Sequence, residues 1–106
     1  MPQTNLLLIA DHASNYIPKK YNNLGVSKKE ILTHKAYDPG VKDLALNLSN
    51  KLNSYLILGD YSRLLIDFNR DLNDPTLISA ISDRKLIIGN KNITKQERIN
   101  RINNMY

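Results

Sequence analysis

The feature that most constrains the fold is the stretch of residues 62–70, which begins as an apolar run and ends in a polar cluster. Its apolar part, Leu-Leu-Ile at residues 64–66, is short and continuous, as is typical of a strand buried on both faces of a sheet. We therefore predict a strand over residues 63–68. A chain with such a strand needs helices or loops on both sides of the sheet.

The polar cluster that follows this run contains Asp67, Asn69 and Arg70. Ligands of open α/β sheets bind beyond the carboxyl ends of the strands, which is where these side chains are expected. Arg70 can hold a carboxylate through two hydrogen bonds, and Asn69 adds a neutral donor and acceptor. The alternative is a polar turn in which Arg70 pairs with Asp67 or Asp71.

Two further apolar runs, at residues 5–10 and 55–58, predict strands of the same sheet. Between them, residues 39–53 have apolar side chains at helical spacing, with Asp38 as the expected N-cap and Pro39 in the first turn. This helix is expected to pack on the sheet through its apolar face, which consists of Val41, Leu44, Ala45, Leu48 and Leu52.

Two capping boxes predict two more helices. Ser27 with Glu30 marks the start of a short helix that reaches about His34, and Thr94 with Glu97 marks the start of a helix near the end of the sequence. His34 lies where an imidazole can bond the last carbonyls of its helix, and this structural role competes with a catalytic one.

Length and charge narrow the class of protein. The 106 residues suit a single domain, and the net charge of +5 comes from basic residues that are scattered along the chain. A nucleic-acid-binding protein more often has a basic stripe with interleaved aromatic residues, so no nucleic acid is expected as a partner. Cysteine is absent, and no apolar run approaches the ~20 residues that span a bilayer. We expect a cytoplasmic protein that does not bind membranes.

The first predicted strand runs directly into Asp11, His12 and Ser14. A strand end with these side chains is a common place for chemistry, because it sets polar groups at the edge of a sheet. His12 is a candidate metal ligand, and Asp11 is a second ligand or a group that orients the imidazole. The alternative is that the neighbouring Asp and His form a surface turn.

Several segments together resemble the N-formylglutamate amidohydrolase family. They are Asp-His-Ala-Ser-Asn at residues 11–15 followed by Ile-Pro, the Tyr-Asp-Pro-Gly that ends at Gly40, and residues 61–75, with Ser82-Asp83 and Ile-Gly-Asn at residues 88–90 after them. The family is similar to the zinc carboxypeptidases and aspartoacylases. The resemblance implies an α/β fold of phosphorylase/hydrolase-like type, with a mixed, mostly parallel sheet flanked by helices.

The resemblance also implies roles for the candidate residues. The implied reaction is metal-assisted hydrolysis of the amide bond of an N-formyl or other N-acyl amino acid such as N-formylglutamate, with zinc as the probable metal. His12 and Asp11 would then be metal ligands, and Asp38 and Arg63 catalytic residues. Ser14, Asn69 and Arg70 would bind the substrate, with the last two holding its carboxylate.

Length is the main departure from the family. Members of the family are considerably longer and supply a later histidine, so we expect residues 1–106 to form a single, incomplete domain that corresponds to the N-terminal part of such an enzyme. The alternative function is a non-catalytic remnant that keeps the fold and binds a small carboxylate, and a basic nucleic-acid module is a weaker third. An incomplete sheet exposes an edge or a core face, so a homo-oligomer is also expected.

Overall fold

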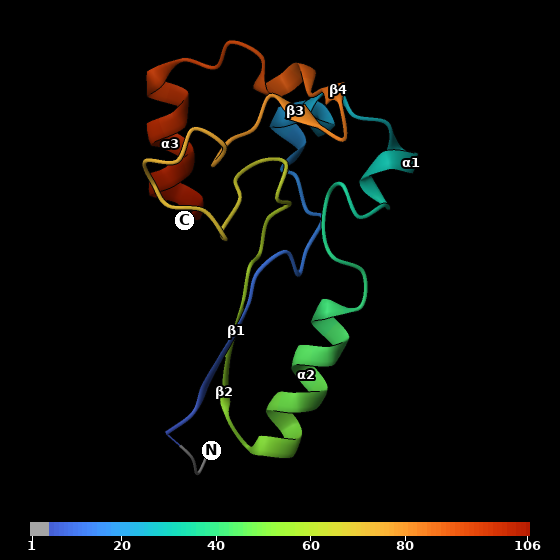
Figure 1. The fold of residues 1–106 in the computed structure, drawn as a ribbon, viewed down its shortest axis with the longest axis vertical. Helices are drawn as coiled ribbons and strands as arrows, with labels where there is room; N and C mark the ends of the chain where they lie inside the picture. Colours follow the sequence, from blue (N-terminus) through green and yellow to red (C-terminus); the bar gives the residue numbers. More distant parts are fainter. Residues whose placement is uncertain (1–4) are drawn as a thin grey trace.

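The computed structural model describes residues 5–106 and is elongated, with extents of 46 × 29 × 23 Å. A β-α-β unit forms one end, in which β1 (Leu7–Ala10) and β2 (Tyr55–Leu58) lie beside α2 (Val41–Leu52) (Figure 1). The other end carries the rest of the regular structure: 3₁₀ helices at Lys19–Gly25 and Ile88–Asn90, α1 (Lys28–Ile31), β3 (Ile81–Ser82), β4 (Lys85–Leu86) and α3 (Lys95–Met105). The chain is therefore of the α/β class.

The sheet of the β-α-β unit has two strands among the described residues. β1 and β2 pair in parallel, with Leu7 opposite Tyr55 and Ala10 opposite Leu58. The strands predicted at residues 5–10 and 55–58 are thus confirmed, the first starting two residues later than expected. β3 and β4 form a separate antiparallel pair, Ile81 opposite Leu86.

The prediction of a third strand at residues 63–68 is wrong, although the prediction that its apolar residues are buried is correct. Leu65 and Ile66 are fully buried, but the backbone turns there, because their amide groups both donate to the carbonyl oxygen of Ser62, at 3.0 and 3.3 Å. An apolar run requires burial and does not by itself require a strand. Here the run crosses the core as an irregular segment.

Side chains, and not a neighbouring strand, form the hydrogen bonds to the backbone carbonyl groups of this buried segment. The Leu64 carbonyl accepts a hydrogen bond from Asn90 Nδ2 at 2.6 Å, and the Leu65 carbonyl accepts one from Arg101 Nη1 at 3.0 Å. Arg101 Nη1 also donates to Asn90 Oδ1 at 2.8 Å. Because buried backbone groups must be paired, these two side chains are what allow an irregular segment to pass through the core.

The helix predicted at residues 39–53 is observed as α2, but its apolar face is not buried as expected. Ala45 is buried, whereas Leu44, Leu48 and Leu52 are 60%, 41% and 43% exposed. Two strands are narrower than a helix with its side chains, so only one line of residues lies over the sheet. The helix begins after Gly40 (φ 89°) and not with Asp38 as its cap.

Both predicted N-caps are confirmed. Ser27 Oγ accepts the amide hydrogen of Glu30 at 3.1 Å, and Thr94 Oγ1 accepts that of Glu97 at 3.0 Å. The first helix is shorter than predicted, since α1 ends at Ile31 and the chain continues in turns to residue 38.

One face of the β1–β2 sheet is open in the described part of the chain. Its alternate residues Leu7, Ile9, Tyr55 and Ile57 are 47–67% exposed. Parallel sheets are usually covered on both faces, and α2 covers only one here (Figure 1). None of the described helices has the length and apolar character needed to cross a membrane.

Candidate functional site

The site forms where the turn after β1 meets the buried segment of residues 62–70. His12 has a φ of 55°, in the left-handed region that is uncommon for a residue with a side chain. Its carbonyl accepts the amide hydrogen of Asp38 at 2.8 Å, and the Ala36 carbonyl accepts the Ser62 hydroxyl at 2.7 Å. These bonds hold three separate parts of the chain side by side.

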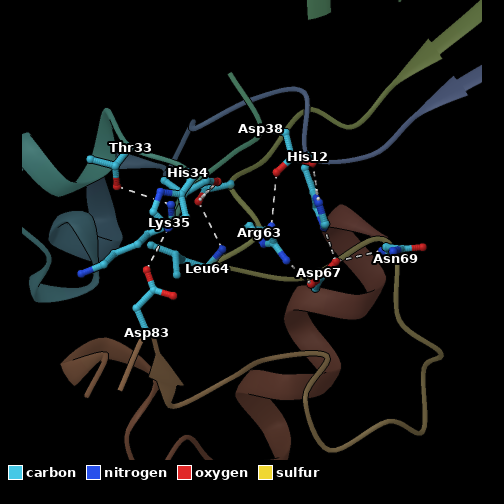
Figure 2. A network of polar contacts seen from close by, with 12 residues as sticks. His12, Thr33, His34, Lys35, Asp38, Arg63, Leu64, Asp67, Asn69 and Asp83 are labelled. Carbon is cyan, nitrogen blue, oxygen red and sulfur yellow. Dashed lines mark hydrogen bonds and ion pairs between the residues drawn. The ribbon is translucent and has the colours of Figure 1, made fainter. Parts of the chain in front are cut away.

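Two carboxylates and two cationic or polar groups form a closed ring at this point (Figure 2). His12 Nδ1 lies 3.2 Å from Asp38 Oδ2, and His12 Nε2 lies 2.6 Å from Asp67 Oδ1. On the other side, Arg63 Nη1 donates to Asp38 Oδ1 at 3.3 Å, and Arg63 Nη2 lies 3.7 Å from Asp67 Oδ2. Each carboxylate therefore uses one oxygen for the imidazole and the other for the guanidinium.

Burial makes the His12–Asp67 part of this ring sensitive to the loss of either partner. The side chains of His12 and Asp67 are only 8% and 9% exposed. A neutral imidazole has one N–H, so it can donate to one of the two carboxylates, and donation to both requires the imidazolium form. Removing one partner would leave a buried charge without compensation, which costs several kcal/mol more than losing a surface ion pair.

A cavity of about 190 Å³ lies on the solvent side of Asp67. We call it the anion pocket, and its lining is rich in cations and hydroxyl groups: Lys35, Arg63, Leu64, Asp67, Arg70, Thr76, Ser79, Ile81 and Ser82. Arg70 is 47% exposed and pairs with Asp67 through Nε at 3.8 Å. Its guanidinium thus keeps donors that face the cavity or the solvent, as carboxylate binding requires.

The third cation of the pocket, Lys35, is already paired. Its Nζ lies 2.8 Å from Glu30 Oε2, and this ammonium group is the main reason why the pKa of Glu30 lies below its ordinary value. Lys35 therefore contributes less free positive charge to the pocket than Arg63 and Arg70 do. The guanidinium groups are the better candidates for ligand binding.

The structure brings together four of the predicted site residues and leaves others apart. His12, Asp38 and Arg63 lie in the ring, and Arg70 joins it through Asp67. His12 and Arg70 do not open on one cleft, because His12 is buried and does not line the anion pocket, which Arg70 does.

The remaining candidates lie around the site. Ser14 lines a different cavity of about 410 Å³, and its Oγ accepts the amide hydrogen of Tyr16 at 3.0 Å. Asp11 lines a third cavity, of about 450 Å³, over the open face of the sheet. Asn69 is exposed, and its backbone amide donates to Asp67 Oδ1 at 3.0 Å. His34 is exposed and contacts Asp83 at 2.9 Å.

The described residues do not fit a zinc ion as they stand. Within residues 5–106 no group of three or more His, Cys, Asp or Glu side chains could hold a metal. Both ring nitrogens of His12 already face carboxylates, and Asp11 lines a separate cavity. A catalytic zinc site uses three protein ligands with free donor atoms, so this arrangement lacks the donor set.

The sequence did not indicate the central role of Asp67 in the site, nor did it indicate that hydroxyl groups line the anion pocket. Asp67 was considered as a turn partner of Arg70, and that pairing is confirmed. Nothing in its position indicated that it also meets His12, 55 residues away in the chain. Thr76 and Ser79 come from an irregular stretch without a recognisable pattern, and Ser82, in β3, was quoted only as part of the family resemblance.

Comparison with known proteins assigns the family. No curated protein matches the sequence. The chain is similar to the crystal structure of gene product Atu2144 from Agrobacterium tumefaciens, with 35% sequence identity and a TM-score of 0.95. The match covers 99% of this chain and 42% of that one, so this chain spans less than half of the length of its relative. The model of the N-formylglutamate amidohydrolase family matches residues 4–106, and the chain belongs to this family.

Proposed function

We propose that this chain is the carboxylate-binding part of an amidohydrolase that acts on an N-formyl or other N-acyl amino acid such as N-formylglutamate. The observation that carries the proposal is the anion pocket, where Arg63 and Arg70 flank one cavity next to the His12–Asp67 pair. Family membership supports hydrolysis of an amide bond as the reaction class.

The size and chemistry of the anion pocket suit a small carboxylate. A guanidinium group matches the two oxygens of a carboxylate in one plane, and the pocket has two such groups. Pockets for drug-sized ligands have volumes of about 300–1,000 Å³, and this one has about 190 Å³. An amino acid with a small acyl group is therefore a better match than a peptide or a nucleotide.

Zinc is the metal that the family resemblance implies, and it polarises the amide carbonyl and activates water in enzymes of that type. Because the described residues lack its donor set, we assign substrate binding to this chain and derive no step at a metal from it. His12 and Asp38 then hold the arginine side of the site in place. Asn69 and Arg70 lie at its solvent edge.

Calorimetric titration tests the proposal. N-formylglutamate is expected to bind the wild-type chain, and the diamide of the same compound is not, because it lacks the carboxylates. Arg70→Lys keeps the charge but loses the planar fork, so the dissociation constant should rise about tenfold. Arg84→Lys, at an exposed arginine outside the pocket lining, is the matched control and should bind like the wild type.

Two results would contradict the proposal. One is equal affinity for N-formylglutamate and its diamide, since the carboxylates would then contribute nothing. The other is an equal effect of the Arg70→Lys and Arg84→Lys substitutions, since the guanidinium of Arg70 would then have no special part in binding.

The second candidate function is a non-catalytic carboxylate-binding protein, which the incomplete donor set favours. A formate-release assay with zinc present separates the two. Carboxylate binding without turnover at any protein concentration supports the non-catalytic function for this chain on its own. Turnover near one per second, an ordinary enzymatic rate, would show that the chain forms a complete active site.

A further inference from the structure

We propose that Asp67 is the positioning residue of the anion pocket: its buried carboxylate holds the guanidinium groups of Arg63 and Arg70 on the pocket wall. The inference rests on the proposed binding of a carboxylate in that pocket and adds the group that prepares it. Asp67 is 6% exposed, so few other groups compete for its oxygens.

The two carboxylate oxygens of Asp67 have different contacts. Oδ1 is held in place, because it accepts the Asn69 amide hydrogen at 3.0 Å and lies 2.6 Å from His12 Nε2. Oδ2 contacts the two arginines, since it lies 3.7 Å from Arg63 Nη2 and 3.8 Å from Arg70 Nε. A carboxylate fixed on one oxygen by short bonds can thus hold two arginines through the other.

The arginines depend on this contact to different extents. Arg63 is 30% exposed and has a second carboxylate partner in Asp38, whereas Arg70 is 47% exposed and its ion pair is with Asp67. Long side chains lose rotamer freedom when they bind a ligand, and a contact that orders them beforehand removes part of this cost. Arg70 should gain most from Asp67.

The negative charge of Asp67, considered alone, predicts the opposite effect on ligand binding, so an experiment can distinguish the two roles. Asp67 is the acidic residue in the pocket lining, and its negative charge repels an anionic ligand. If Asp67 acted only through its charge, Asp67→Asn would tighten the binding of every anion. If it acts by positioning, the same change should weaken the binding of a carboxylate, whose two oxygens need the arginine forks aligned, and should not weaken that of a monatomic anion such as chloride.

The experiment measures the affinities of N-formylglutamate and chloride for the wild-type and Asp67→Asn chains by calorimetry. Positioning predicts that Asp67→Asn weakens the binding of N-formylglutamate about tenfold and leaves the binding of chloride unchanged or tighter. It also predicts that Arg70→Lys adds little further loss in the Asp67→Asn background, because both changes remove the same alignment. N-formylglutamate affinity that stays equal or rises in Asp67→Asn overturns the inference.

A measurement on the wild-type chain covers the case in which Asp67→Asn does not fold. In ¹⁵N relaxation of the ligand-free protein, the Nε–H vectors of Arg63 and Arg70 should be ordered, with an order parameter near about 0.85, and that of the exposed Arg84 should fall below about 0.6. A mobile Arg70 in the ligand-free protein overturns the inference. Failure of the wild type to bind N-formylglutamate would overturn the proposed function as well as the inference. Normal binding by the wild type with a mobile Arg70 would overturn the inference alone.

Discussion

Asn90→Ala tests whether side-chain hydrogen bonds hold the buried segment that carries the site. Asn90 is 3% exposed, and its Nδ2 donates to the Leu64 carbonyl at 2.6 Å and to the Ser79 carbonyl at 2.8 Å. Its Oδ1 accepts from Arg101 Nη1 at 2.8 Å. Alanine would remove all three bonds at once and leave the Leu64 carbonyl buried and the Ser79 carbonyl partly buried without this partner.

The expected loss follows from these partners. A buried polar group left without a partner costs about 1–3 kcal/mol, and Arg101 Nη1 keeps its bond to the Leu65 carbonyl. Two carbonyl groups therefore account for most of the effect, and we expect Asn90→Ala to lower the free energy of unfolding by about 3–5 kcal/mol. A domain of this size has about 5–15 kcal/mol in total, so this loss is a large fraction of the stability and should clearly lower the urea concentration at the midpoint of unfolding.

Urea unfolding followed by circular dichroism measures this change. The matched control is Asn103→Ala, an exposed asparagine on α3, which should change the free energy of unfolding by less than about 0.5 kcal/mol. Hydrogen exchange adds a local readout, since the Leu65 amide should lose its protection in Asn90→Ala before the amides of α2 do. A loss below about 1 kcal/mol, or equal losses in both variants, would refute the reasoning.

Further predictions concern the core, acid stability and the neighbouring cavity. Leu65→Ala should lower the free energy of unfolding by about 2–5 kcal/mol because Leu65 is fully buried, whereas Leu48→Ala should lower it by less than about 1 kcal/mol. Equal losses in urea unfolding would contradict the observed burial. The lowered pKa of Glu30 means that its ion pair with Lys35 stabilises the fold fully above the ordinary carboxyl pKa and loses this effect as the pH falls through the lowered value. Lys35→Met should therefore flatten the decline of the urea midpoint between about pH 6 and about pH 3, and an unchanged decline would count against the pair. Ser14→Ala should leave calorimetric affinity for N-formylglutamate unchanged, since Ser14 lines another cavity; a loss as large as that of Arg70→Lys would move the ligand there.

Local patterns predicted the elements that local forces determine. The N-caps at Ser27 and Thr94 were predicted correctly because the cap and its partner lie three residues apart in the sequence. The parallel pair β1–β2 follows from two apolar runs with a helix between them. The same reasoning correctly assigned burial to residues 64–66.

Contacts between distant residues could not be predicted in this way. Nothing near Leu64 indicates that Asn90 and Arg101 supply its segment with hydrogen bonds, so the run was predicted as a strand. In the same way, the pairing of His12 with Asp67 depends on the path of the chain between them. The strand-end patterns identified His12 and Arg70 as candidates, and the family resemblance added Asp38 and Arg63. Neither showed that His12, Asp38 and Arg63 form a ring with Asp67.

Mapping of the ligand by NMR tests the central claim most directly. In a titration of the ¹⁵N-labelled chain with N-formylglutamate, the side-chain Nε–H signals of Arg63 and Arg70 and the backbone amides of Ser79 and Ser82 should shift together, because these residues line the anion pocket. The amides of Ser14, Gly40 and Asp60, which line the cavity of about 410 Å³, should stay in place. Shifts confined to the second set, with the arginine signals unchanged, would contradict the account.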